Sequence, residues 1–191
     1  MSSNPLRVFM PPEMFAPAAF KHFEGEAGIA VIKAGPDLYD FAEPLSWQAD
    51  ITNTGGALLV TGEVRGEART ACARCLKEVS FPVVGEIEGY FLTEPEGEAP
   101  DEMEEDEFDV LPDDRTIDFE PLITAALLME FPLIPLCDED CKGLCPHCGA
   151  DLNEGPCGCE NPSEVKDASS PDAAPSNSSP FAVLKDYKFG E

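Results

Sequence analysis

The sequence predicts an α+β fold, in which an antiparallel sheet or partial barrel is packed by one buried helix and carries a small zinc-ribbon-like lobe. Three features predict it: alternating apolar and polar residues between positions 45 and 91, one apolar helical segment near 118–131, and eight cysteines at short spacings. Alternation with period two is typical of half-buried strands, and closely spaced cysteine pairs are typical of metal-binding turns.

The alternating segments predict three successive strands. Residues 45–51 form the first, and 52–56 (Thr-Asn-Thr-Gly-Gly) form a turn, because Asn and Gly tolerate positive φ. In 58–72 the apolar or small residues share one parity and the charged residues the other, and 79–91 resumes the alternation. We expect the last two strands to form a hairpin whose tight turn carries the first cysteine pair.

The apolar segment after these strands predicts a helix. Asp118 is a suitable N-cap, the helix runs to about Phe131, and Pro132 ends it. Its apolar residues cover nearly the whole circumference, so we expect burial on most sides, against the sheet or a partner. These residues are Leu122, Ile123, Ala125, Ala126, Leu127, Leu128 and Met129.

Composition divides the chain into four parts. Residues 1–36 lack periodicity and are expected to be an irregular N-terminal segment, and 37–160 are expected to form the main domain, with an acidic loop at 94–115 and a cysteine-rich zinc lobe at 137–159. Residues 161–178, rich in Ser, Pro, Ala and Asp, predict a disordered linker. Apolar residues return in 179–191, which predicts a short docking segment, either for the chain's own domain or for a partner.

The charge balance limits the classes of partner. Twelve basic and 38 acidic residues give a formal net charge of −26, which repels phosphate backbones and favours a basic protein as partner. Acidity that serves solubility alone is the other interpretation. The sequence shows no signal-peptide pattern and no apolar segment of membrane-spanning length, so we expect a cytoplasmic protein with reduced cysteines.

The cysteines predict one or two structural Zn²⁺ ions. Our preferred grouping places Cys72, Cys75, Cys137 and Cys141 at one site and Cys145, Cys148, Cys157 and Cys159 at another. The alternative is one ion held by Cys72, Cys75, Cys145 and Cys148. Both preferred sites are closed sets of four thiolates, which is typical of structural rather than catalytic zinc. With no recognisable catalytic constellation in the sequence, we predict a protein that is not an enzyme; a zinc- or redox-dependent enzyme is a weaker alternative.

A basic segment surrounds the first cysteine pair. It comprises Arg65, Arg69, Arg74 and Lys77, and it is a candidate contact for RNA or for an acidic partner surface. Glutamates lie among these residues, so cross-strand ion pairing is the competing and stronger interpretation. In the C-terminal segment, Phe181 and Leu184 are candidate partner contacts, because residues three apart share one face of a helix.

These cysteine motifs resemble those of a bacterial family. The resemblance rests on Cys-Ala-Arg-Cys-Leu at 72–76, on the cysteine-rich segment 132–153, on Cys-Gly-Cys at 157–159 and on Pro-Phe-Ala-Val-Leu at 180–184. The chain is similar here to the YceD family, the large ribosomal RNA subunit accumulation proteins, over about residues 38–188. Some members of that family keep the first cysteine pair and lack the four cysteines matching the second set, which supports two separate sites.

The resemblance implies a non-enzymatic ribosome-biogenesis factor that supports accumulation of large-subunit ribosomal RNA. Its partners would be a ribosomal protein or pre-ribosomal particle and large-subunit ribosomal RNA, with no membrane and no small-molecule substrate. The alternative is a zinc-stabilised adaptor or chaperone for one basic ribosomal protein, without RNA contact.

Overall fold

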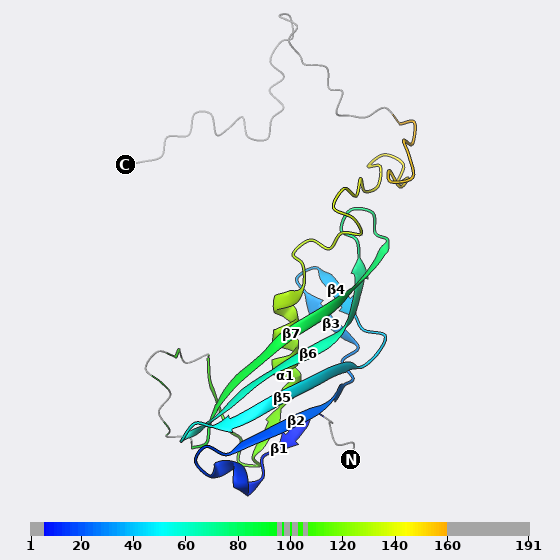
Figure 1. Ribbon diagram of the computed structural model, residues 1–191. Coiled ribbons are helices and arrows are strands. Elements are labelled where there is room, and N and C mark those ends of the chain that lie inside the picture. Colours follow the sequence, from blue (N-terminus) through cyan, green and yellow to red (C-terminus); the bar gives the residue numbers. More distant parts are fainter. Residues whose placement is uncertain (1–5, 95–96, 98–99, 101–102, 105–106, 160–191) are drawn as a thin grey trace, which may run out of the picture.

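The computed structural model describes residues 6–94, 97, 100, 103–104 and 107–159. Its main feature is a twisted seven-stranded sheet with one helix packed along one face (Figure 1). The cysteine-rich segment extends beyond one end of the sheet, next to the turn of its longest hairpin. The predicted α+β class, with an antiparallel sheet and a single helix, is therefore confirmed.

Three long strands form the centre of the sheet: β5 (Leu45–Asn53), β6 (Ala57–Ala71) and β7 (Glu78–Leu92). β6 pairs antiparallel with β7 along its whole length, from Ala57↔Leu92 to Ala71↔Glu78. The predicted parity holds, because the apolar side chains of β6 are buried while its charged residues lie on the opposite face. Alternation thus predicted both the strands and the face that each residue occupies.

The N-terminal 36 residues are not irregular, and this expectation was wrong. They contain β1 (Arg7–Phe9), the 3₁₀ helix η1 (Pro12–Phe15), β2 (Phe20–Ala27) and β3 (Val31–Ala34). β2 pairs antiparallel with β5 from Phe20↔Thr52 to Ala27↔Leu45 and so belongs to the main sheet. Its side chains are mostly exposed or half-buried, so it lacks the clear apolar alternation that reveals a strand in sequence.

β6 has two different partners on the flank opposite β7. β5 pairs with its first half, from Asn53↔Leu58 to Ser46↔Arg65, and β4 (Asp37–Asp40) pairs farther along at Asp40↔Arg69. β3 adds to β4. The end of the acidic loop forms β8 (Asp109–Val110), which pairs parallel with β7, and β9 (Thr116–Asp118) forms a separate two-stranded sheet with β1. The last residues of that loop are therefore part of the fold.

The helix α1 (Phe119–Glu130) follows β9 directly, and the Oδ1 of its N-cap residue Asp118 accepts a hydrogen bond from the Glu120 N–H at 3.0 Å. Predicted N-cap and helix agree with the structure. α1 packs across β7, where an ideal Cβ on Gly85 would lie 2.7 Å from the backbone of Ala126. The absence of a side chain at Gly85 allows this close approach.

The hydrophobic core lies between α1 and the sheet. Aromatic rings join the two layers: Trp47 stacks on Phe119 with centroids 4.5 Å apart, and Tyr39 stacks on Phe131 at 3.9 Å. Three of the cysteines, Cys72, Cys75 and Cys141, form a separate small cluster at the hairpin turn. The main core thus contains no cysteine.

The helix is buried toward the sheet and exposed on its other side. Phe119, Ile123, Ala126 and Leu127 are buried, whereas Leu128 and Met129 are 40% and 84% exposed. The expectation that α1 would be covered around most of its circumference is therefore not met by the described residues. No helix among these residues has both the length and the apolar character needed to cross a membrane.

Candidate metal centres

The first set of four thiols lies at the turn between β6 and β7. Cys72 and Cys75 are supplied by this turn, and Cys137 and Cys141 by the segment after α1. The Cys72 and Cys141 sulfurs are 3.8 Å apart, and those of Cys75 and Cys137 are 3.5 Å apart. Three of the four residues are buried and Cys137 is exposed. Two segments distant in sequence therefore bring four sulfurs to one point.

Backbone contacts hold the two segments together at this point. The Ala73 N–H donates to the Pro135 carbonyl at 2.8 Å. The Arg74 guanidinium donates to the carbonyls of Glu139 and Cys141, at 3.2 and 2.9 Å. The Cys72–Cys75 turn closes through the Leu76 N–H, which donates to the Cys72 carbonyl at 2.9 Å. Main-chain hydrogen bonds and the Arg74 side chain therefore fix the position of the sulfurs.

The spacing of these sulfurs fits a tetrahedral ion. With metal–sulfur bonds of about 2.3 Å, the edges of a tetrahedron of thiolates are about 3.8 Å. All four sulfurs lie within 4.8 Å of one another, and two of the distances between them are 3.5 and 3.8 Å. These distances are far longer than the roughly 2.05 Å of a disulfide bond, and all eight cysteines are free.

The thiols of the first set have unequal affinities for protons. Burial raises the pKa of Cys72, but three backbone N–H hydrogen bonds outweigh burial and lower the pKa to about 6. The pKa of Cys137 is raised to about 12, because it shares hydrogen bonds with the Cys75 and Cys141 thiols. Four negative charges so close together repel one another, and a bound divalent cation would remove that repulsion.

The second set lies at the outer end of the cysteine-rich segment. Cys145, Cys148, Cys157 and Cys159 have all four sulfurs within 4.8 Å of one another. The Cys145–Cys148 turn repeats the hydrogen bonding of the first, with the Gly149 N–H donating to the Cys145 carbonyl at 2.8 Å. The left-handed residue after this turn is Gly149 (φ 72°), whereas the first turn has Leu76 (φ 61°). The two sets coincide with the grouping preferred from the sequence.

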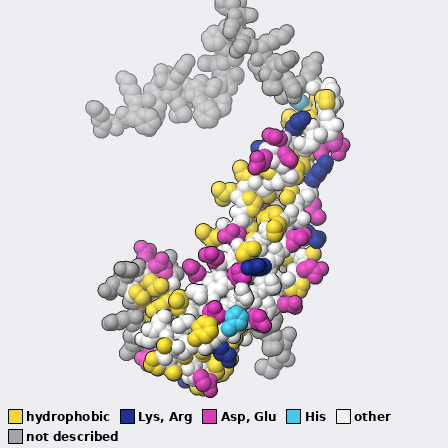
Figure 2. All heavy atoms as spheres, in the orientation of Figure 1, with side chains coloured by type: hydrophobic (Ala, Val, Ile, Leu, Met, Phe, Trp, Pro, Cys, Tyr) yellow, Lys and Arg dark blue, Asp and Glu magenta, His cyan; other side chains and the backbone are white. Residues whose placement is uncertain are grey.

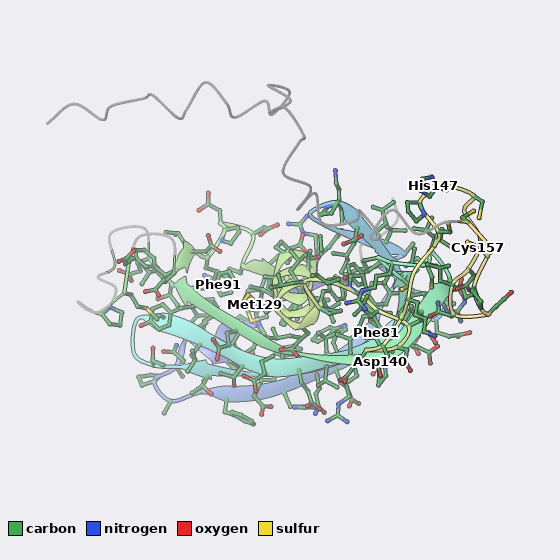
Figure 3. All side chains as sticks on the ribbon, turned by 90° about the horizontal axis from the view of Figure 1, so that it is seen from above. Phe81, Phe91, Met129, Asp140, His147 and Cys157 are labelled. Carbon is green, nitrogen blue, oxygen red and sulfur yellow. The ribbon has the colours of Figure 1, made fainter. Side chains whose placement is uncertain are left out.

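The electrostatics of the second set resemble those of the first. Backbone N–H groups of Cys148 and His147 lower the pKa of Cys145 to about 6, and hydrogen bonds with Cys148 and Cys157 raise the pKa of Cys159 to about 12. His147 lies on the outside of this lobe (Figure 3). The donor set is therefore four sulfurs, with the imidazole outside it.

Three polar residues link the two sets, and the sequence analysis assigned none of these contacts. Lys77, beside the first turn, pairs with Asp151 at 2.5 Å. Asn153 donates from Nδ2 to the Cys141 sulfur at 3.4 Å and accepts from the Lys142 N–H at 2.7 Å. The sequence signal for these contacts is Asp-x-Asn at 151–153, just after the second cysteine turn, because Asp and Asn side chains often form hydrogen bonds with nearby backbone. The second set is thereby attached to the first.

Most side chains of the predicted basic contact segment bind to other residues of the same chain. Arg65 pairs with Glu63 at 2.7 Å on the same strand, which lowers the pKa of Glu63 through their hydrogen bond. Arg74 and Lys77 make the contacts described above, and Arg69 is half-buried on β6. Phe181 and Leu184 lie outside the described residues. Three of the four basic side chains therefore have intramolecular partners.

The sheet, the single helix and the two sets of four thiols define a class: small α+β proteins with closed cysteine sites of the kind that hold structural metal. The chain belongs to a particular family within that class. Residues 60–188 match the family model of the large ribosomal RNA subunit accumulation protein YceD. The match includes both cysteine sets and continues through the C-terminal segment.

Curated relatives agree with this membership. An uncharacterized protein of Mycobacterium tuberculosis is 38% identical over 110 residues, which are 56% of this chain and 50% of the relative. A chloroplastic homolog of the large ribosomal RNA subunit accumulation protein from Arabidopsis thaliana is 26% identical over 157 residues, 69% of this chain and 48% of the relative. The chain therefore spans about half the length of these relatives. No solved structure matches significantly.

Proposed function

We propose that this protein is a non-enzymatic ribosome-biogenesis factor that supports accumulation of large-subunit ribosomal RNA. The observation that carries the proposal is the family match over residues 60–188. The geometry is consistent with a binding role, because both thiol sets are closed and use four protein ligands. We further propose that the protein acts in the cytoplasm, where ribosomes assemble.

The metal in this proposal is zinc, with one ion in each thiol set. Soft thiolate ligands in a tetrahedron suit Zn²⁺, which would join the hairpin turn to the segment after α1 without redox chemistry. The eight cysteines would be the ligands, Cys72, Cys75, Cys137 and Cys141 for one ion and Cys145, Cys148, Cys157 and Cys159 for the other. Elemental analysis should find two zinc ions per chain, and Cys72→Ser and Cys148→Ser should each lose one.

The sheet face opposite α1 is the surface we propose for a basic partner. Figure 2 shows acidic side chains spread over this face with few basic ones among them. Glu63 and Glu86 are directly opposite each other on β6 and β7, and the pairing of Glu63 with Arg65 offsets the repulsion that such like charges cause in a sheet. Other acidic residues of the face are Glu24, Glu26, Asp50, Glu67 and Glu88. A surface that keeps facing like charges is suited to a Lys- or Arg-rich partner.

A second candidate function is an adaptor or chaperone for one basic ribosomal protein, without contact to RNA. The engagement of Arg65, Arg74 and Lys77 inside the molecule favours it, because these side chains then have fewer free donors for phosphate. Both functions use the acidic face. They differ in whether RNA is needed for association with the ribosomal precursor.

The first experiment deletes the gene and measures large- against small-subunit ribosomal RNA. The proposal predicts a lower ratio, restored by the parent gene and by Glu13→Lys but not by the double variant Glu86→Lys/Glu88→Lys. Glu13 is an exposed acidic residue on η1, outside the strands of the acidic face, so this variant controls for reversal of an acidic charge elsewhere on the surface. An unchanged ratio after deletion, at slow and fast growth, would contradict the proposal.

The second experiment separates the two functions. Tagged protein is recovered from cells, with and without nuclease treatment, and the bound ribosomal proteins are identified. Association that survives digestion, and that the Glu86→Lys/Glu88→Lys variant loses, supports the adaptor. Association lost on digestion supports RNA contact, and Arg69→Glu should then weaken it.

A further inference from the structure

The outer side of α1 presents an apolar surface that the described residues leave uncovered. Along the helix, Pro121, Thr124, Ala125 and Leu128 line a shallow hollow of about 460 Å³ together with Asp118 and Glu120. These positions follow the i, i+3, i+4, i+7 spacing of one helix face. We call them the outer stripe of α1.

Three more exposed apolar side chains lie in the last turn of α1 and just beyond it. Met129 is 84% exposed, and Leu133 and Ile134 are 99% and 64% exposed. The opposite side of the helix, formed by Phe119, Ile123, Ala126 and Leu127, is buried against β7 and the rest of the core. A helix apolar on both sides is typical of one that is covered on both sides, and a contiguous exposed apolar surface marks a contact site.

We infer that the outer stripe of α1 is the docking site of the chain's own C-terminal segment 180–188, Pro-Phe-Ala-Val-Leu-Lys-Asp-Tyr-Lys. Phe181 and Leu184 would enter the hollow beside Leu128. This inference does not depend on the proposed function.

Charge favours this occupant. The rim of the hollow carries the carboxylates of Asp118 and Glu120, and Glu130 lies at the end of the helix. In the segment, the apolar residues are followed by Lys185, Asp186 and Lys188, which give it a net charge of +1 in a chain of net charge −26. A second copy of the same protein would instead bring its own net charge of −26 to an acidic rim.

Chain length permits the contact. Phe181 is 22 residues beyond Cys159, a distance that spans about 70 Å when extended and about 25 Å as a flexible coil. The sulfur of Cys145 lies within 4.8 Å of that of Cys159, and Cys145 is 15 residues from the end of α1, hence at most about 50 Å away. The linker can therefore reach the outer stripe.

Family membership links the two partners of the contact. The family match begins before α1 and ends at residue 188, so it includes the C-terminal segment as well as the helix. Docking gives both the same role, which is to cover apolar surface.

Photocrosslinking on the full-length, metal-loaded protein tests the inference. A photoreactive phenylalanine at position 124 should crosslink within one chain to peptides covering 180–188, with a yield independent of protein concentration. The double variant Phe181→Ala/Leu184→Ala should reduce the yield at least tenfold, whereas Lys166→Ala in the linker should leave it unchanged. The core of the described residues is complete without these positions, so folding does not confound either change.

The same experiment names the outcomes that overturn the inference. A crosslinked dimer whose yield rises with concentration would assign the outer stripe to a second copy. If position 124 crosslinks to other proteins in cell extract and not to residues 180–188, the outer stripe is assigned to a partner. Hydrogen exchange of residues 119–130 gives an independent measurement: the double variant should exchange faster than the parent, and equal rates would count against docking.

Discussion

Asn153 donates its side-chain N–H to the sulfur of Cys141 at 3.4 Å, so a residue between the two cysteine pairs of the second set bonds directly to a thiol of the first set. The same side chain accepts from the Lys142 N–H and donates to Asp151, whose carboxylate pairs with Lys77. Hydrogen bonds to a ligand sulfur orient it and adjust the strength of its metal bond. The segment that carries the second thiol set therefore contributes to the first site.

We expect Asn153→Ala to weaken metal binding at the first set while leaving the total metal content of freshly purified protein unchanged. Removing a group that supports a ligand commonly costs about 10–100-fold in metal affinity. The measurement is the rate of zinc release to a colorimetric chelator, which should become biphasic. Glu154→Gln is the matched control: it changes an exposed carboxylate near Lys77 that does not contact sulfur. Equal release rates for both variants would contradict this role of Asn153.

Removing the metal should unfold one end of the molecule and spare the other. The main core between α1 and the sheet contains no cysteine, while Cys72, Cys75 and Cys141 form a separate cluster with Val79, Leu136 and Leu144. A strong chelator should therefore expose the amides of 72–77 and 137–159 to hydrogen exchange and leave those of β5 and the middle of β6 protected. Loss of protection throughout the sheet would show that the metal stabilises the whole fold.

Gly85→Ala should destabilise the protein by about 1–3 kcal/mol, the usual cost of adding atoms to a packed core. A Cβ there would meet the backbone of Ala126 at 2.7 Å, so α1 would have to move away from β7. Gly28→Ala is the control, since its Cβ would have no neighbour within 4 Å, and its effect should stay within about 0.5 kcal/mol. Urea denaturation of both variants measures the difference, and similar stabilities would contradict the close packing of α1 on β7.

The strands at the centre of the fold could be predicted because their sequences alternate. In β6, Val60, Val64 and Ala68 point to the core and the charged residues between them point away, so register and face follow from parity. The N-cap of α1 could be predicted from Asp118 followed by an apolar segment. The preferred grouping of the cysteines came from their spacing and from the need for four ligands per ion, and the same spacing also allowed one ion held by Cys72, Cys75, Cys145 and Cys148.

Other parts could not be predicted, for identifiable reasons. β2 is an edge strand that pairs with β5 on one side. Its Lys, Glu and Gly residues give it the composition of a loop. β4 contacts β6 at a single register pair, Asp40↔Arg69, which depends on where β5 begins. The contacts of Lys77 with Asp151, and of Asn153 with Cys141, join residues 74 and 12 positions apart. Such pairs are set by the fold rather than by local spacing.

Replacing Leu76 with glycine should stabilise the protein slightly. Leu76 has φ 61° directly after the first cysteine turn, where the second turn has Gly149 at φ 72°. A left-handed conformation costs a residue with a Cβ about 1–2 kcal/mol, and glycine avoids this strain. Glycine also loses more chain entropy on folding, which costs about 0.5–1 kcal/mol. The net gain in stability should therefore be about 0.5–1 kcal/mol. The Leu76 side chain is 67% exposed and contributes little burial. Thermal unfolding of the metal-loaded protein should show a higher Tm for Leu76→Gly and no gain for Leu76→Ala, which keeps the Cβ and its strain. A gain of equal size in both variants would attribute the effect to the exposed leucine side chain and remove the argument from backbone strain.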